Sequence, residues 1–410
     1  MWFDFNLHSG LLLPIVLQGL IFGLVLLARG LREQRLPDRL LGFFLIMAAL
    51  LVAQWMLGFA GWYNEKDGRT QFMYYFIWDW TLALGPLLYF YFRSLTNTSF
   101  QLKNEHWLHF LPMALIVGSG MVSAIFDLGI SQGMRGETLP YDGGAYGEWY
   151  QIGLGALGVV LHTISTPLSL IYWGYTFILF RRYRLYVNEN FSDDAHISFR
   201  WLGRFLPLML IAFAVWFTRG LLMQLGIIAD DAYITSWYFY MAWGVVIYFL
   251  SIQGAQAHTQ LRQALEFQPS MGVGKESIPT GKDQMLDQSI SEAELDELRS
   301  IAKHLDITML EKELFLEPDL NLKRVSEATR LPAPRLSRAI NEIKDQNFNE
   351  YVNGFRVARV RELLQGTKAQ EFSLLGVALE AGFNSKATFN RVFKQHTGQT
   401  PSQYVKSLKD

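Results

Sequence analysis

Residues 382–401 read GFNSKATFNRVFKQHTGQTP, and the rest of the chain is organised around this stretch. A glycine-containing turn leads into a short helix that has Phe389, Val392 and Phe393 on one apolar face. The other face is left to four polar residues: Lys386, Asn390, Arg391 and Lys394. An apolar back and a cationic, amide-bearing front are typical of a recognition helix that enters a DNA groove. An ordinary amphipathic surface helix has the same polarity, so the choice depends on the rest of the chain.

A similar pattern occurs earlier, at 320–343. A helix to about residue 329 is followed by a turn at 330–333, and Pro334 suits the first position of the next helix. Off the apolar face of that next helix lie Arg335, Arg338 and Asn341. The pattern returns at 373–398, after an intervening helix of about 17 residues and hence about 25 Å. Two helix-turn-helix units so joined can reach successive major grooves, which lie about 34 Å apart.

Charge agrees with this interpretation. Residues 320–410 carry 15 Lys and Arg against 8 Asp and Glu, in a chain whose net charge is −1. Such local basicity is the footprint of phosphate contact. Residues 291–319 carry nine acids against three bases, which predicts that they lie away from DNA. A capping box at Ser291–Glu294 opens a helix there, whose apolar face packs on its own domain or pairs with a second chain.

The C-terminal third also shares a long set of residues with one known family. The shared residues are LSRAIN at 336–341, NFNEYVN at 347–353, Arg356, Leu363, Leu364, AGFNSK at 381–386, Phe389, Phe393, Lys394, Thr397, Gly398, Thr400, Pro401 and Tyr404. In these the chain resembles the AraC-type family of bacterial transcription regulators over residues 290–408. The resemblance implies a sequence-specific reader of double-stranded DNA with two helix-turn-helix units. It also implies that the groove and phosphate contacts are Arg335, Arg338, Asn341, Lys386, Asn390, Arg391 and Lys394. Ser326 and Val360 depart from the alanine that is common at their positions.

The first 255 residues have a different character. Half of the whole chain is apolar and only 18% is charged, below the roughly 25% usual for soluble domains. Seven apolar runs each reach the roughly 20 residues that a helix needs to cross a membrane. Buried helices of a large soluble core fit poorly, since such helices rarely lack a polar face for so long. The predicted spans are 9–28, 40–60, 72–92, 107–126, 152–180, 202–228 and 233–252.

The connections between these runs predict an orientation. Eleven Lys and Arg lie in segments 29–39, 93–106 and 181–204, against three in the segments on the other side. The positive-inside rule therefore places the N-terminus outside and the C-terminal domain in the cytoplasm. This predicts a multi-pass protein of the bacterial cytoplasmic membrane, with the lipid bilayer as a partner.

A few ionisable residues fall within the predicted spans. Asp79 and Arg219 lie at matching depths in the outer half, and His162 could join them. Intramembrane ionisable groups are costly and suggest a function, here a pocket for a small-molecule or membrane signal. The alternative is an interhelical pair that only locks the bundle together.

The whole chain is thus predicted to be all-α, with three parts. Residues 1–255 form a seven-span transmembrane sensor bundle, residues 256–290 a flexible linker with a reach of about 25–30 Å, and residues 291–410 the DNA-binding domain. The chain has no cysteine, which excludes disulfides and thiolate metal sites. No catalytic motif is visible, so we expect neither an enzyme nor a cofactor or metal.

We therefore expect a membrane-bound transcription regulator that couples a signal in the bundle to promoter binding. Two mechanisms remain open: formation of a homodimer through the helix at 291–305, or release of an occluded reader. The alternative function is a transporter or membrane enzyme with an accessory DNA-binding tail. A transporter would more readily show internal repeats and a polar path across the whole bilayer, and the sequence shows neither.

Overall fold

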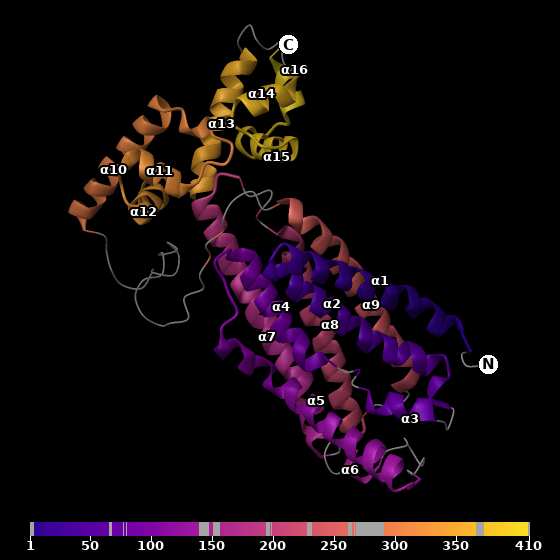
Figure 1. The fold of residues 1–410 in the computed structure, drawn as a ribbon. Coiled ribbons are helices and arrows are strands. Elements are labelled where there is room, and N and C mark those ends of the chain that lie inside the picture. Colours follow the sequence, from indigo (N-terminus) through magenta and orange to yellow (C-terminus); the bar gives the residue numbers. More distant parts are fainter. Residues whose placement is uncertain are drawn as a thin grey trace. The chain divides into compact units, whose positions relative to one another are not determined.

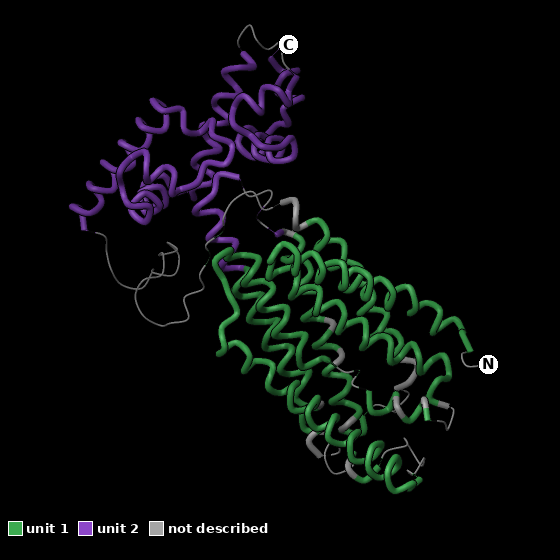
Figure 2. Tube along the Cα trace, in the orientation of Figure 1, with its two compact units in different colours: residues 1–180, 201–267 green, residues 181–200, 268–410 purple. Residues whose placement is uncertain are grey.

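The computed structural model is all-α over the part of the chain that it describes (Figure 1). The described residues are 4–64, 68–76, 78, 80–138, 147–150, 156–193, 197, 199–227, 232–260, 265, 267, 291–365 and 373–408. An isolated antiparallel β-bridge joins Phe191 and Asn321. The chain divides into two compact units, coloured separately in Figure 2: residues 1–180 with 201–267, and residues 181–200 with 268–410.

The first unit is built from long apolar helices. They are α1 (Leu7–Arg32), α2 (Leu36–Phe59), α3 (Gly68–Tyr75), α4 (Thr81–Thr96), α5 (Leu111–Ala124), α6 (Glu148–Tyr150), α7 (Ala156–Asn190), α8 (Arg200–Gln224) and α9 (Ala232–Gln260), with short helical turns η1 (Trp62–Asn64) and η2 (Asn104–Phe110) and the π-helix η3 (Ile125–Met134).

Helices α1 and α2 form a close hairpin. A Cβ atom on Gly23 would lie 3.0 Å from the Gly42 carbonyl oxygen, so only glycine allows this approach.

Several of these helices are long and apolar enough to cross a membrane. Among the described residues there are five such segments: Leu7–Arg32, Leu36–Phe59, Asn104–Met134, Trp201–Met223 and Ser236–Gln256. Each overlaps one of the predicted spans.

The third predicted span, 72–92, is not one uninterrupted helix. Helix α3 ends at Tyr75 and α4 begins at Thr81, and the 16 residues of α4 make only about 24 Å of helix. The predicted linker also begins later than expected, since α9 continues to Gln260. Beyond it, the backbone N–H of Thr98 donates to Leu265 O and that of Phe267 donates to Thr96 O. The remainder of the linker lies outside the described residues.

Over its described residues, the second unit has seven C-terminal helices and a segment that comes from the end of α7. The helices are α10 (Glu292–Glu311), α11 (Leu322–Thr329), α12 (Ala333–Lys344), α13 (Phe348–Gln365), α14 (Leu374–Glu380), α15 (Lys386–Thr397) and α16 (Pro401–Ser407), with the short turn η5 (Leu314–Leu316). The division into units assigns residues 181–200 to this body, which the sequence analysis had placed in the membrane bundle.

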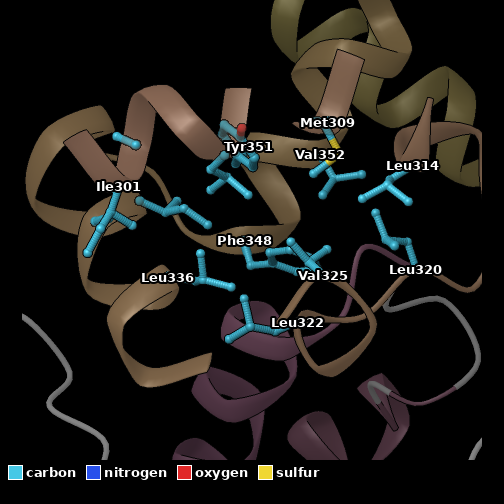
Figure 3. Close-up of a cluster of buried hydrophobic side chains, with 14 of the residues drawn as sticks. Ile301, Met309, Leu314, Leu320, Leu322, Val325, Leu336, Phe348, Tyr351 and Val352 are labelled. Carbon is cyan, nitrogen blue, oxygen red and sulfur yellow. The ribbon is translucent and has the colours of Figure 1, made fainter. Parts of the chain in front are cut away.

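Helices α10, α11 and α12 share one core with the first half of α13. Leu336 of α12, Val325 of α11 and Phe348 of α13 are fully buried and converge in it (Figure 3). The apolar face of α10 also belongs to this core, because Leu305 and Met309 are buried there. That face therefore packs on its own domain, and pairing with a second chain would have to use another surface.

The second half of α13 belongs to another core, shared with α14, α15 and α16. Val360 and Leu364 pack there with Phe389 and Phe393 of α15. Val360, which departs from the family's alanine, is fully buried, so the larger side chain is accommodated. Helix α13 thus lies between the two groups of helices and belongs to both (Figure 1).

A strap of chain, residues 314–320, holds the two groups together. Gly382, in the turn before α15, has a φ of +89°. A Cβ atom there would lie 2.5 Å from the Phe315 carbonyl oxygen and 2.9 Å from Leu316 Cα. Asn384 Nδ2 donates to the Pro318 carbonyl oxygen at 3.0 Å. Glycine is therefore required at position 382 both by the backbone conformation and by the close approach of the strap.

We predict that Gly382→Ala destabilises the second unit much more than Gly398→Ala does. Gly398 also has a positive φ of +76° but has no atom within 4 Å of an added Cβ, so its substitution adds only backbone strain of about 1 kcal/mol. Pulse proteolysis of the full chain in urea would compare the two midpoints. Equal midpoints would show that the strap does not constrain position 382.

Candidate nucleic-acid interface

Helix α12 is held by its apolar back and by the turn that precedes it. Leu336 and Ala339 are fully buried. Arg330 ends α11 in the left-handed region at φ 58°, and the Ser326 hydroxyl donates to the Leu331 carbonyl oxygen at 2.5 Å. The serine that departs from the family's alanine thus closes the α11–α12 turn. These contacts fix which side of α12 faces outward.

Two of the predicted DNA contacts on α12 are paired with acids of α10. Arg335 forms an ion pair with Glu297, and Arg338 Nη1 lies 2.6 Å from Glu294 Oε1. These four side chains line a groove of about 200 Å³. Two acids of the stretch 291–319 thus contact predicted DNA-binding arginines, while the position of this stretch away from DNA stays a prediction. Both pairs are about half exposed, so each contributes at most about 1 kcal/mol and exchanges easily for a phosphate.

The third predicted contact on α12 is paired with an acid from the end of α7. Asn341 Nδ2 donates to Glu189 Oε2 at 3.2 Å, and the Ser337 hydroxyl donates to the same oxygen at 3.2 Å. Burial raises the pKa of Glu189, and the nearby Glu350 adds to this, whereas the two hydrogen bonds lower the pKa. Burial thus removes the carboxylate from water, and the two hydrogen bonds from α12 replace part of the lost hydration.

Helix α15 presents its polar side openly. Ser385 caps the helix by accepting the backbone N–H of Thr388 at 3.1 Å, while Phe389 and Phe393 hold its back in the core. All four predicted contacts on this helix are exposed: Lys386, Asn390, Arg391 and Lys394. Within the described part of the chain, Lys386 and Lys394 form no ion pair, in contrast to the two arginines of α12.

The end of α7 also approaches α15. A polar cavity of about 350 Å³ has walls from three helices. Its lining residues are Arg184 and Asn188 of α7, Asn347 just before α13, Asn349 and Glu350 of α13, and Arg391 and Gln395 of α15. The segment 181–193 thus reaches residues of both predicted recognition helices.

Arg356, at the middle of α13, is bound to several of the segments that form the candidate interface. Its fully buried guanidinium donates to the carbonyl oxygens of Phe315 at 2.8 Å and Glu317 at 2.8 Å, and to Ser192 Oγ at 3.1 Å. It also lies 5.9 Å from the centre of the Phe383 ring. Burial lowers the pKa of Arg356 to about 10, against the opposite effect of nearby aspartates, so the group stays charged at neutral pH.

The predicted sensor residues are only partly described. Asp79 and the side chain of His162 lie outside the described residues, and Arg219 is half-buried in α8. The structure adds a buried carboxylate that the sequence analysis missed: Asp127, which accepts the Tyr75 hydroxyl and the Tyr150 backbone N–H, both at 2.9 Å. The predicted span ends at residue 126, one residue before Asp127, but the helix continues through Asp127 as η3. Its spacing of four from Ser123, which is also buried, was the only available signal.

Nothing in the described part of the chain suggests a metal centre, since no three His, Asp or Glu side chains there lie close enough to share an ion.

Comparison with known proteins shows which proteins the C-terminal domain is similar to. A family model described as a helix-turn-helix domain matches residues 325–407. A probable transcription factor, PqrA of Proteus vulgaris, is 30% identical over 95 residues, which are 23% of this chain and 75% of that protein. Uncharacterised HTH-type transcriptional regulators of Staphylococcus aureus strains COL and MSSA476 are 35% identical over 92 residues, 22% of this chain and 12% of theirs. No solved structure matches.

The fold and these relatives define a helix-turn-helix transcription regulator that binds DNA. Through its C-terminal domain the chain belongs to the AraC-type family of such regulators.

We predict that Arg356→Ala lowers the stability of the second unit by about 3 kcal/mol or more, because it leaves buried carbonyl oxygens of the strap without a donor. Arg359→Ala is the matched control. Arg359 forms an exposed pair with Glu362, so its loss should cost less than about 1 kcal/mol. Urea unfolding of the full chain, followed by proteolysis of the second unit, would measure both. If Arg356→Ala lowered the stability of the second unit only slightly, Arg356 would not hold these segments together.

Proposed function

We propose that this protein is a membrane-bound, sequence-specific transcription regulator that couples a signal sensed in its apolar helices to promoter binding. One observation carries the proposal: a helix-turn-helix domain at 325–407 follows, in one chain, five helices long and apolar enough to cross a membrane among the described residues. The relatives support the DNA-binding half of this proposal. The membrane half rests on the helices alone.

Two helix-turn-helix units read the DNA. Helices α11 and α12 form the first unit, and α14 and α15 form the second. The connecting helix α13 has 18 residues and is therefore about 27 Å long. With its flanking turns, this length suits recognition helices in two successive major grooves about 34 Å apart.

The exposed side chains of α12 and α15 supply the contacts. Arg338 can read guanine with two hydrogen bonds, and Asn341 and Asn390 can each read adenine in the same way. The remaining cations suit phosphates, which fix the position of the domain without carrying sequence information: Arg335, Lys386, Arg391 and Lys394.

The apolar helices hold the protein in the bacterial cytoplasmic membrane as a seven-span bundle. The distribution of Lys and Arg favours an outer N-terminus and a cytoplasmic DNA-binding domain. The DNA must then come to the membrane. Asp79, His162 and Arg219 remain candidates for sensing the signal, a small molecule or a change in the membrane.

Chromatin capture of the intact protein, together with carbonate extraction of membranes from the same cells, tests the two halves separately. We expect defined promoters among the captured DNA and the protein in the carbonate-resistant pellet. Absence of any enriched promoter would contradict the regulator, and release by carbonate would contradict the membrane bundle.

We predict that Lys394→Ala and Asn390→Ala affect DNA binding in different ways. Loss of a phosphate contact at Lys394 should weaken binding to all sequences alike and reduce the slope of log affinity against log salt by about one. Loss of a base contact at Asn390 should leave that slope unchanged and lower discrimination at one base pair by about 1–3 kcal/mol.

Fluorescence anisotropy with a captured promoter and its single-base variants, at several salt concentrations, would measure both effects. An unchanged slope for Lys394→Ala, or equal weakening on every duplex for Asn390→Ala, would refute the assigned role.

A further inference from the structure

The end of α7 is built into the DNA-binding unit. We call residues 181–193 the α7 tail. Its Ser192 is fully buried, and Phe191 is nearly so. The Ser192 backbone N–H donates to the Leu320 carbonyl oxygen at 3.0 Å, and Asn349 Nδ2 donates to the Ser192 carbonyl oxygen at 2.8 Å. With the Arg356 bond to Ser192 Oγ, these contacts make the tail a specific occupant of this surface.

The tail places a carboxylate on one stripe of α12. Ser337 and Asn341 are four residues apart, so their side chains are neighbours along the helix, and both donate to Glu189. Asn341 is one of the side chains expected to read a base. A carboxylate oxygen is a hydrogen-bond acceptor with negative charge, as is a phosphate oxygen, and base edges also offer acceptors to asparagine. Glu189 therefore occupies the Asn341 donor that DNA would use.

We propose that the α7 tail is an intramolecular competitor of DNA: it docks on α12 through Glu189 and keeps the first helix-turn-helix unit from reading its site until the tail leaves. This proposal rests on the proposed function, because it names the regulation of the same DNA-binding surface. It selects release of an occluded reader over dimerisation through α10, whose apolar face is buried in its own core.

The acidic side chains that contact α12 come from two different helices and play different roles. Glu294 and Glu297 belong to α10, which is anchored in the core and stays beside α12 whether DNA is bound or not. Their pairs with Arg338 and Arg335 are exposed and exchange readily. Glu189 instead lies near the end of α7, and most of α7 and α8 belongs to the first unit. A change in the relative position of those helices therefore pulls on the tail.

The absence of cysteine makes a direct test possible. In the full chain in lipid nanodiscs, Glu189→Cys is combined with Ser337→Cys, and a short bifunctional methanethiosulfonate joins the two thiols reversibly. The DNA probes are duplexes that full-length Glu189→Ala selects from a random-sequence library. Each single-cysteine variant, treated with the same reagent, controls for modification without a bridge.

We expect efficient cross-linking, at least about tenfold weaker binding of the selected duplexes by the bridged protein, and full recovery with dithiothreitol. Bridged protein that binds as tightly as reduced protein would overturn the competitor, because the docked tail would then be compatible with DNA. Failure of the two thiols to cross-link would overturn it as well, by showing that the tail is not docked. Selection that yields no duplex at all would instead overturn the proposed function.

A charge-matched comparison uses substitutions without cross-linking. Glu189→Ala should bind the selected duplexes more tightly than the unchanged chain. Glu311→Ala removes the same charge from an exposed position at the end of α10, so it should leave the affinity nearly unchanged. If both substitutions tighten binding equally, the effect is one of net charge and the docking of Glu189 is refuted.

Discussion

The buried guanidinium of Arg356 is the interaction on which the arrangement of the DNA-binding unit depends. A buried cation is unfavourable unless its donors are satisfied. Here Nε and Nη2 of Arg356 find acceptors in segments far apart in the chain, whereas the buried Nη1 has no hydrogen-bond partner among the described residues. Carbonyl oxygens of the strap bind the guanidinium from one side, the Phe383 ring lies on another, and Ser192 of the α7 tail supplies a hydroxyl. The helices α11 and α12, the helices α14 and α15 and the tail therefore share one anchor, and each is placed relative to the others by the same charged group.

The contacts of Arg356 explain why Glu189, an acid from outside residues 291–410, lies against α12. Once Ser192 is bound to Arg356 and to Leu320, the preceding turn of α7 must run beside α12. Glu189, three residues earlier, then meets Ser337 and Asn341. Its raised pKa shows that burial of this carboxylate opposes docking, while the two hydrogen bonds favour it. Opposing contributions of this kind leave a contact that is specific in geometry yet modest in free energy, as a reversible switch requires.

The sequence predicts the parts of this structure that are set locally. The apolar spacing of Phe389, Val392 and Phe393 fixes the face of α15, and Ser385 marks its start. Contacts between distant segments were not predictable in the same way. Glu189 lies about 150 residues from its partners and has no pattern of its own. The pairing of Glu294 and Glu297 with two arginines of α12 was not predicted either, because net charge says nothing about which acids face which arginines. The break between α3 and α4 was also missed, since hydropathy reports burial rather than helix continuity.

A competitor carried on the same chain has a physical advantage over a separate inhibitor. Its effective concentration at α12 is set by the geometry of the connection between α7 and α8 and not by expression level. A weak contact therefore suffices to occupy the reader, and a small displacement of either helix suffices to remove it. The second helix-turn-helix remains exposed throughout, since Lys386, Asn390 and Lys394 face outward. The docked protein can then hold DNA through α15 alone, by contacts that are mostly electrostatic, and gains full sequence discrimination when Asn341 is released. In this scheme the signal controls specificity more than attachment.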